Sequence, residues 1–319
     1  MKPPFVWLSV QIKFWITHYC DRLPDKDEYH APIYYTMKDL HRDFCLTTGP
    51  SQGITNLPQY PTFTKFWKKF FGNVKFPDKN YLGKCDTCTE IKMLRAKTAL
   101  TFHESERLAN ILKEHNQIQE SERIAYKKRS LEGSQDSANI LSIIMDSMRM
   151  KMIPHVFPFP KSLSSLNPLA VSIFGILNHS NDSQHFYLQY AYWSGGANHI
   201  LSLLFNYTYS YFQQGNRPKV LIIQADNSWK ESKNRIIFAT LAWFVHLGLF
   251  NRVEMHCLIQ GHTHEDIDQT FSTIARAFWI TTILSIPDFQ KLIHKSFKRK
   301  TYTPTFDQVW NFNEFFEGI

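Results

Sequence analysis

The sequence predicts an α/β protein: a mixed five-stranded sheet with flanking helices, preceded by a mostly helical N-terminal region. Five apolar runs of strand length occur between residues 140 and 259, and segments with helical spacing of apolar residues separate the later ones. Of the 319 residues, 43% are hydrophobic and only 12 are glycine, which is typical of a folded globular protein. A chain of this length has room for one large core and a smaller module.

The N-terminal module is expected at residues 1–84. This region is rich in aromatic and basic side chains, and prolines interrupt it, which predicts short helices joined by loops. One of these helices is amphipathic, and its aromatic residues share one side: Phe63, Phe66, Trp67 and Phe70. Packing in a core is the simplest explanation of these aromatics.

Residues 85–135 are expected to form a separate segment that begins at the sequence Cys85-Asp-Thr-Cys88. From residue 90 to 130 there is neither proline nor glycine, which predicts one long helix or a helical hairpin. Residues 131–138 are polar and include Gly133, so we expect a linker there.

Residues 136–300 are expected to form the core, and residues 301–319 a C-terminal tail. The five strands are expected at residues 140–146, 169–177, 186–193, 219–226 and 252–259. Helices are expected at residues 197–214, 233–249 and 267–278. Because crossovers return right-handed to a parallel neighbour, this order predicts helices on both faces of the sheet. The last residues leave open whether the chain is a fragment or a decayed copy of a longer gene.

Acidic residues follow two of the expected strands and begin a later helix. Asp146 ends the first strand, Asp226 ends the fourth, and Gly-His-Thr-His-Glu-Asp-Ile-Asp follows the fifth as residues 261–268. Functional groups collect at the carboxyl ends of parallel strands, so we expect Asp146, Asp226 and one acid of the last segment to converge. The candidates for that third acid are Glu265, Asp266 and Asp268.

Clustered carboxylates repel one another unless a cation neutralises them, and their oxygen atoms suit Mg²⁺ or Mn²⁺. A pair of such ions supports in-line displacement at phosphorus, which predicts cutting or joining of nucleic-acid strands. Each acid also has a structural explanation, because an Asp after a strand is often a turn former or a helix cap. Asp226-Asn227-Ser228 has the composition of such a cap. The order of the three acids along the strands favours the functional interpretation.

A second metal site is predicted at the cysteine pair. Two thiolates on one tight turn can share a tetrahedral zinc ion, so Cys85 and Cys88 form half of a site. His115 or His103 is a candidate third ligand, and their spacing of 12 residues places them on different faces of a helix. Cys45 or His41 is a candidate fourth ligand. An ordinary pair of reduced cysteines is the alternative.

Several of these segments together resemble a family of uncharacterised eukaryotic proteins regarded as transposon-derived. The resemblance covers roughly residues 30–312 and is carried by Ile144-Met-Asp-Ser-Met, Ile223-Gln-Ala-Asp-Asn with Lys233-Asn234, the 261–268 segment, Lys84-Cys-Asp-Thr-Cys88 and the helix from Glu114-His115 to Tyr126. It implies an RNase H-like core of the DDE transposase type, with Asp268 as the third acid. Ser147 stands where relatives often have glycine.

In that interpretation, Asn227, Asn234, His262 and His264 support the acidic site, together with Glu265 and Asp266. The alternatives are a fold kept for DNA or protein binding without catalysis, and a metallohydrolase. Gly261-His-Thr-His264 is similar to the last metal motif of calcineurin-like phosphoesterases, but their other motifs are absent. The same segment resembles metallo-β-lactamase-type hydrolases, except that Ile267 replaces a required histidine. Histidines that only hydrogen-bond the turn are a further alternative.

Charge and cysteine content indicate the partners and the compartment. Lysine and arginine number 36 against 28 acidic residues, a formal net charge of +8, which favours an anionic partner such as the phosphate backbone of DNA or an acidic membrane. No apolar run is long enough for a membrane span, and Lys13 interrupts the apolar N-terminus before any signal-peptide cleavage site. Five cysteines without a dense framework indicate reduced thiols inside the cell. We therefore expect an intracellular, nuclear protein. Oligomerisation is left open.

Overall fold

The computed structural model describes residues 3–22, 27–31, 36–76, 85–96, 101–191, 196–225, 234–257 and 266–317. The chain divides into two compact units, Met1–Lys84 and Cys85–Ile319, which are described separately below. In the described residues, no helix is both long enough and apolar enough to cross a membrane.

The first unit is mostly helical, as predicted. Its helices are α1 (Pro3–Tyr19), α2 (Met37–His41), the π-helical η1 (Arg42–Thr48), α3 (Gly49–Ser51) and α4 (Tyr60–Phe70). It also has a small unpredicted sheet of two-residue strands, β1 (Asp21–Arg22), β2 (Tyr29–His30) and β3 (Val74–Lys75), which are too short to leave an alternating pattern. Three of the four aromatics predicted to share one side of α4 are buried in a core with α1, whereas Phe70 is exposed.

The second unit begins with two helices, α5 (Asp86–Ala96) and α6 (Phe102–Gln135). The predicted linker at residues 131–138 is wrong for most of its length, because α6 continues through it. Gly133 is needed here for close packing and does not mark a linker. A Cβ atom built on it would lie 2.5 Å from Ser142 Cβ and 3.1 Å from Ser180 Oγ. The glycine therefore allows the end of α6 to pack closely on the sheet.

A six-stranded sheet forms the centre of the second unit. Its strands are β4 (Ile140–Ile153), β5 (Leu169–Asn178), β6 (Ser183–Tyr190), β7 (Val220–Ala225), β8 (Arg252–Cys257) and β9 (Lys300–Tyr302), in the order β8-β7-β4-β5-β6-β9. β4, β5 and β6 are antiparallel neighbours, and β7 and β8 lie parallel to β4. The first five strands have the order and directions of the RNase H fold, which confirms the predicted fold class.

Two details of the predicted sheet are wrong. The sheet has a sixth strand, because β9 pairs with the outer side of β6, and its three residues were too few to predict. β4 does not end at Asp146 but continues to Ile153, since it stays paired with β5 across a bulge between Met148 and Lys151. Beyond the sheet, the short α11 (Phe312–Glu317) packs on α7 (Ala197–Gln213) and α8 (Arg235–His246), so residues of the expected tail contribute to the core.

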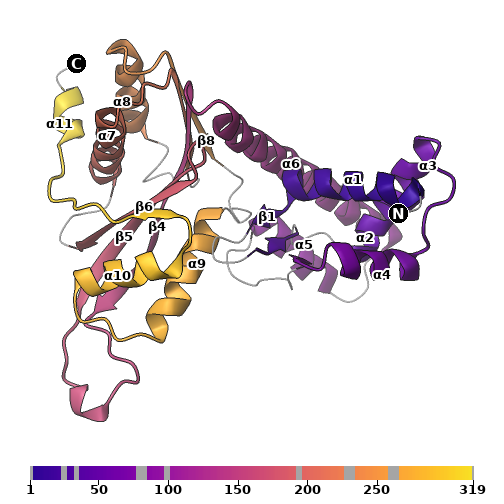
Figure 1. Cartoon of the computed structure of the whole chain (residues 1–319), viewed down its shortest axis with the longest axis horizontal. Helices are drawn as coiled ribbons and strands as arrows, with labels where there is room; N and C mark the ends of the chain where they lie inside the picture. The colour runs from indigo at the N-terminus through magenta and orange to yellow at the C-terminus, as the bar shows by residue number, and fades with distance from the viewer. Residues whose placement is uncertain are drawn as a thin grey trace. The chain divides into compact units, whose positions relative to one another are not determined.

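Helices cover both faces of the sheet (Figure 1). One face carries α7 (Ala197–Gln213) and α8 (Arg235–His246), and the other carries α9 (Asp266–Trp279) and α10 (Ile286–Ser296). A short 3-10 turn, η2 (Lys161–Leu163), lies in the connection between β4 and β5. Alternate residues of β4 point to opposite faces: Ile143 and Met145 join the α7/α8 core, whereas Ile144 and Met148 join the α9/α10 core. Asp146 therefore points to the α9 face.

Candidate functional site

Asp146 lies in the middle of the central strand at the point where β7 ends. The parallel pairing of β4 with β7 finishes at Met145 and Ala225, so Asp146 is the first residue of β4 beyond that pairing. Its side chain is half-buried, and Oδ1 accepts a hydrogen bond of 2.7 Å from the backbone N–H of Ser147. The sheet therefore presents this carboxylate beside the carboxyl end of β7, where the RNase H fold places functional groups.

Asp226 is the next residue after Ala225 and lies outside the described residues, as do Asn227, His262, His264 and Glu265. The other predicted site residues are described. Asn234 is the N-cap of α8, and its Oδ1 accepts hydrogen bonds from the backbone N–H groups of Ile236 and Ile237. That contact gives Asn234 a structural role at the helix start.

The start of α9 lies directly over the strand next to Asp146. Gly175 of β5 is the cross-strand neighbour of Asp146. A Cβ atom built on Gly175 would lie 2.9 Å from the ring of Phe271 and 3.3 Å from Ile267 Cδ1. The absence of a side chain on Gly175 therefore allows α9 to pack this closely on β5. Asp268 follows Ile267 in the first turn of α9 and is half-buried. The structure thus positions the helix of Asp268 over the strand next to Asp146.

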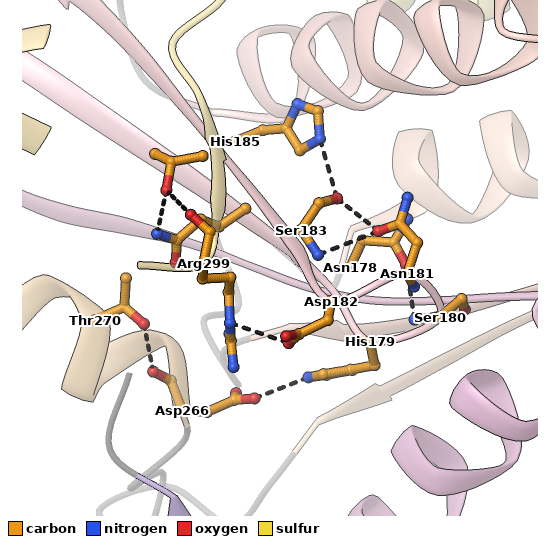
Figure 2. Close-up of polar contacts among 12 residues, drawn as sticks. Asn178, His179, Ser180, Asn181, Asp182, Ser183, His185, Asp266, Thr270 and Arg299 are labelled. Atoms are coloured by element: carbon orange, nitrogen blue, oxygen red, sulfur yellow. Dashed lines mark hydrogen bonds and ion pairs between the residues drawn. The ribbon is translucent and has the colours of Figure 1, made fainter. Parts of the chain in front are cut away.

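The turn between β5 and β6 is held by its own polar side chains. Asn178 Oδ1 accepts a hydrogen bond from the backbone of Ser180, and Ser180 Oγ donates to Ile140 O at 2.8 Å. The backbone N–H of Ser142 in turn donates to Ser180 Oγ at 2.9 Å. These contacts fix the turn against β4 and thereby fix the position of His179. Figure 2 shows this turn beside Asp266 and Arg299.

Asp266, the first residue of α9, is bound on both of its oxygen atoms. Tyr126 Oη donates to Oδ1 at 2.6 Å, and His179 Nε2 contacts Oδ2 at 2.9 Å. Burial by itself would raise the pKa of Asp266, but the charge and hydrogen bond of His179, with Lys127 and Tyr126, hold this pKa well below its usual value. Asp266 is therefore a carboxylate engaged by protein donors.

Cys85, Cys88 and His115 meet as the sequence predicted. One ligand atom from each lies within 4.8 Å of the others, and Cys85 Sγ is 3.3 Å from His115 Nε2. Cys85 is buried, while the other two are half-buried. Burial, followed by the neighbouring Cys85, raises the pKa of Cys88, and burial lowers the pKa of His115. Two sulfurs and one imidazole are a donor set that zinc prefers.

The other proposed ligands of this cluster have different environments. His103 lies at the exposed start of α6 against the ring of Phe102. Cys45 and His41 belong to the first unit, where Cys45 is buried in the core and His41 Nε2 contacts Pro58 O at 2.9 Å. Burial raises the pKa of Cys45 to about 12.

Residues 161–319 match the model of a protein family described as a domain of unknown function, DUF7869. The matched region is just under half of the chain and contains Asp226 and Asp268 but begins after Asp146. No curated protein matches the sequence.

Two solved structures are similar to the chain at low identity. The first, "Crystal structure of the Mos1 Strand Transfer Complex", has 15% identity over 82% of this chain and 84% of that chain, with a TM-score of 0.34. The second, "Mos1 transposase paired-end complex with left transposon end", has 13% identity over 82% of this chain and 90% of that chain, with a TM-score of 0.27. Because both TM-scores are low, the fold assignment rests on the order and directions of the strands.

Sequence reasoning did not find three residues of this region: His179, Gly175 and Gly133. His179 belongs to the polar run from Asn178 to Ser183 between two strands, which was a detectable signal for a turn against the sheet. Gly175 carries no local signal, because its importance depends on α9, which arrives from a distant part of the chain, and Gly133 locally indicates only a linker.

Proposed function

We propose that the chain is a transposase-derived protein that binds DNA and has a two-metal site for phosphoryl transfer, formed by Asp146, Asp226 and Asp268. The observation that carries this proposal is the position of Asp146 on the central strand. It lies at the end of the β7 pairing, beside the strand that leads directly to Asp226 and under the helix that carries Asp268. In this proposal, three separate segments supply acids to one site at the carboxyl end of β7 in an RNase H-like sheet.

The residues at this site fit Mg²⁺ or Mn²⁺. Asp146 and Asp268 are half-buried carboxylates, and their oxygen atoms are the hard donors that these ions prefer. When bound, a pair of these ions activates the attacking hydroxyl or water and stabilises the leaving oxygen. Asp146, Asp226 and Asp268 would hold the ions, and β4 and α9 would keep two of these acids in fixed positions.

The partner in this proposal is DNA, which the net charge of +8 supports. The positive charge of Lys127 in α6 contributes to the low pKa of Asp266. A positively charged side chain therefore lies near the start of α9, the helix that carries Asp268. Lys298, Arg299 and Lys300 precede and begin β9, where Arg299 forms an ion pair of 3.0 Å with Asp182. Action on DNA implies a nuclear location in a eukaryotic cell.

A cleavage assay tests the proposed site. We expect the purified chain with Mn²⁺ to cleave plasmid DNA, and we expect Asp146→Asn, Asp226→Asn and Asp268→Asn to lower the rate at least about 100-fold, because loss of a direct ligand exceeds the effect of its supporting contacts. Asp307→Asn is the matched control, since Asp307 is exposed and belongs to none of the sites.

Other outcomes of this assay would identify a different function. Salt-dependent DNA binding without cleavage by any form would show a non-catalytic DNA-binding protein and overturn the catalytic part of the proposal. Hydrolysis of small phosphate esters that depends on His262 and His264, and not on Asp146, would favour a metallohydrolase.

We further propose that Cys85, Cys88 and His115 bind Zn²⁺. The converging ligand atoms of α5 and α6 support this proposal, because the ion would join the start of α5 to the middle of α6. We expect one zinc per chain by mass spectrometry and loss of that zinc in Cys88→Ser. Cys257→Ser is the control. A wild-type chain without zinc would contradict the proposal.

A further inference from the structure

Tyr126, His179 and Asp266 form a polar network on the α9 face of the sheet. They come from three distant segments: the middle of α6, the turn between β5 and β6, and the first residue of α9. Tyr126 is only 4% exposed, and the His179 side chain is 9% exposed. Buried polar groups of this kind are costly unless they are paired, so the network specifies how these segments meet.

Both carboxylate oxygens of Asp266 are in contact with other side chains, so we do not propose Asp266 as a metal ligand. Its Oδ1 accepts the hydroxyl proton of Tyr126 at 2.6 Å, and its Oδ2 is 2.9 Å from His179 Nε2. Tyr126 Oη and His179 Nε2 are also 3.3 Å apart, so the three polar groups form a closed triangle. Figure 2 shows His179 reaching Asp266 from the turn, and the hydroxyl of Thr270 donating to Asp266 O one turn further along α9.

The network holds the end of the helix that carries Asp268. Asp268 is only two residues after Asp266, in the same helical turn. On the other side of Asp266, residues 258–265 join α9 to β8 and lie outside the described residues. Packing of Ile267 and Phe271 on Gly175 fixes the height of α9 over β5. The hydrogen bonds of Asp266 add a fixed direction and register at its N-terminus, which apolar packing alone does not define.

α6 contacts each of the elements that carry or precede the proposed acids. Besides Tyr126 at α9, Arg129 Nη2 lies 3.4 Å from Gln224 Oε1, two residues before Asp226. Gly133 packs against Ser142 of β4, the strand of Asp146. Tyr126, Arg129 and Gly133 are three or four residues apart and therefore share one face of the helix. One face of α6 thus bridges β4, β7 and α9.

We propose that Tyr126 and His179 are positioning residues that, through Asp266, hold α9 so that Asp268 reaches the metal site. This inference rests on the proposed function. The two residues touch neither substrate nor ion. They act by fixing the first turn of α9, which places Asp268 relative to Asp146, in the way that outer contacts orient the ligands of a metal site.

The test compares Tyr126→Phe with Tyr187→Phe in the full chain. Tyr187 is a fully buried tyrosine on the opposite face of the sheet, so both variants remove one buried hydroxyl and keep the ring. Two properties are measured: Mn²⁺ affinity by paramagnetic resonance, and hydrogen exchange of the backbone amides of α9. We expect Tyr126→Phe to weaken Mn²⁺ binding about 10-fold to 100-fold and to speed exchange at residues 266–271, whereas Tyr187→Phe changes neither.

His179→Gln is the second variant, because it removes the imidazole from the other oxygen of Asp266, and we expect the same two effects. Unchanged exchange at the start of α9 in both variants would overturn the inference. Faster exchange with unchanged Mn²⁺ affinity would also overturn it, since the network would then be structural only. Failure of the proposed function looks different: the wild-type chain itself would bind no Mn²⁺, and the exchange data, which need no ion, would decide the anchoring of α9 by themselves.

Discussion

The two faces of the six-stranded sheet differ in what their side chains do. The face under α7 and α8 is a dense core of aliphatic and aromatic residues, with Leu203, Leu204, Ile223 and Phe244 almost completely buried. The face under α9 and α10 has a core of its own but also holds Asp146 and the Tyr126, His179 and Asp266 network.

One face of the sheet thus mainly stabilises the fold, and the other also carries the side chains of the proposed metal site. Apolar packing is non-directional, so the α7/α8 face can stabilise the fold with few directional contacts, such as the hydrogen bond of 2.8 Å from Asn178 Nδ2 to Tyr207 Oη. Carboxylates that share ions must be positioned closely, and hydrogen bonds supply that direction on the α9 face. We therefore expect core substitutions on the two faces to have similar costs in stability and different consequences for metal binding.

Truncation of one core residue on each face tests this difference. Leu203 of α7 and Ile267 of α9 are both 0% exposed. We expect Leu203→Ala and Ile267→Ala each to lower the free energy of unfolding by about 3 kcal/mol, because each leaves a cavity. Only Ile267→Ala should weaken Mn²⁺ binding, since Ile267 adjoins Asp268. Denaturant unfolding and Mn²⁺ titration measure the two effects, and equal loss of Mn²⁺ affinity in both variants would contradict the separation of roles.

A smaller effect is expected at Gly175, where α9 approaches the sheet most closely. The Cβ atom of Gly175→Ala would meet the ring of Phe271 at 2.9 Å, so the ring and the helix must move outward. We expect a loss of about 1–2 kcal/mol in stability, typical of overpacking, together with weaker Mn²⁺ binding. Gly175→Ala with Phe271→Leu should recover much of both losses. A single variant that is as stable as the wild type would show that α9 is not seated on this glycine.

An effect on stability similar in size to that of Gly175→Ala, but without an effect on metal binding, is a dependence on pH at the α7/α8 face. Burial, with Lys300 nearby, lowers the pKa of His185 to about 4, and the imidazole packs against Tyr207 and Tyr302. The folded state therefore holds His185 neutral at a pH where the unfolded chain binds a proton, so stability falls as the pH decreases from about 6.5 toward 4. We expect a loss of about 1–2 kcal/mol, allowing for partial exposure.

The variant His185→Gln tests this effect, because it removes the titrating group from the same position. Its free energy of unfolding should change less between pH 7 and pH 4 than that of the wild type, as measured by denaturant unfolding at each pH. An equal pH dependence in the two proteins would assign the effect to other groups.

Local patterns were sufficient for most of the elements of the second unit. The helix expected at residues 267–278 is α9 almost to the residue, since its apolar positions repeat at helical spacing, and the strand at residues 169–177 is nearly β5. The ends of β4 and α6 were predicted wrongly. Both elements continue past a residue that predicted an end, Asp146 in β4 and Gly133 in α6. β4 continues because it stays paired with β5, and Gly133 of α6 is covered by Ser142 of β4.

The two candidate sites differ in the same way. Two candidate ligands of the cysteine cluster, Cys85 and Cys88, are three residues apart, so their proximity follows from one helical turn. Only the third candidate ligand, His115, had to be selected from two histidines. The proposed acidic site combines residues more than 100 positions apart in the sequence, such as Asp146 and Asp268. Their order along the chain predicts a common site, but it did not show that Asp266 of the last segment contacts Tyr126 and His179.

The sequence by itself determined the order of most strands and helices in the second unit and the cysteine pair, because periodicity and short-range spacing are local properties of a chain. Only the tertiary structure decided that Asp266 binds Tyr126 and His179, that α9 rests on Gly175 and that one face of α6 contacts β4, β7 and α9. These contacts join residues far apart in the chain. Their energies depend on burial and on hydrogen-bond geometry, which exist only after the chain has folded.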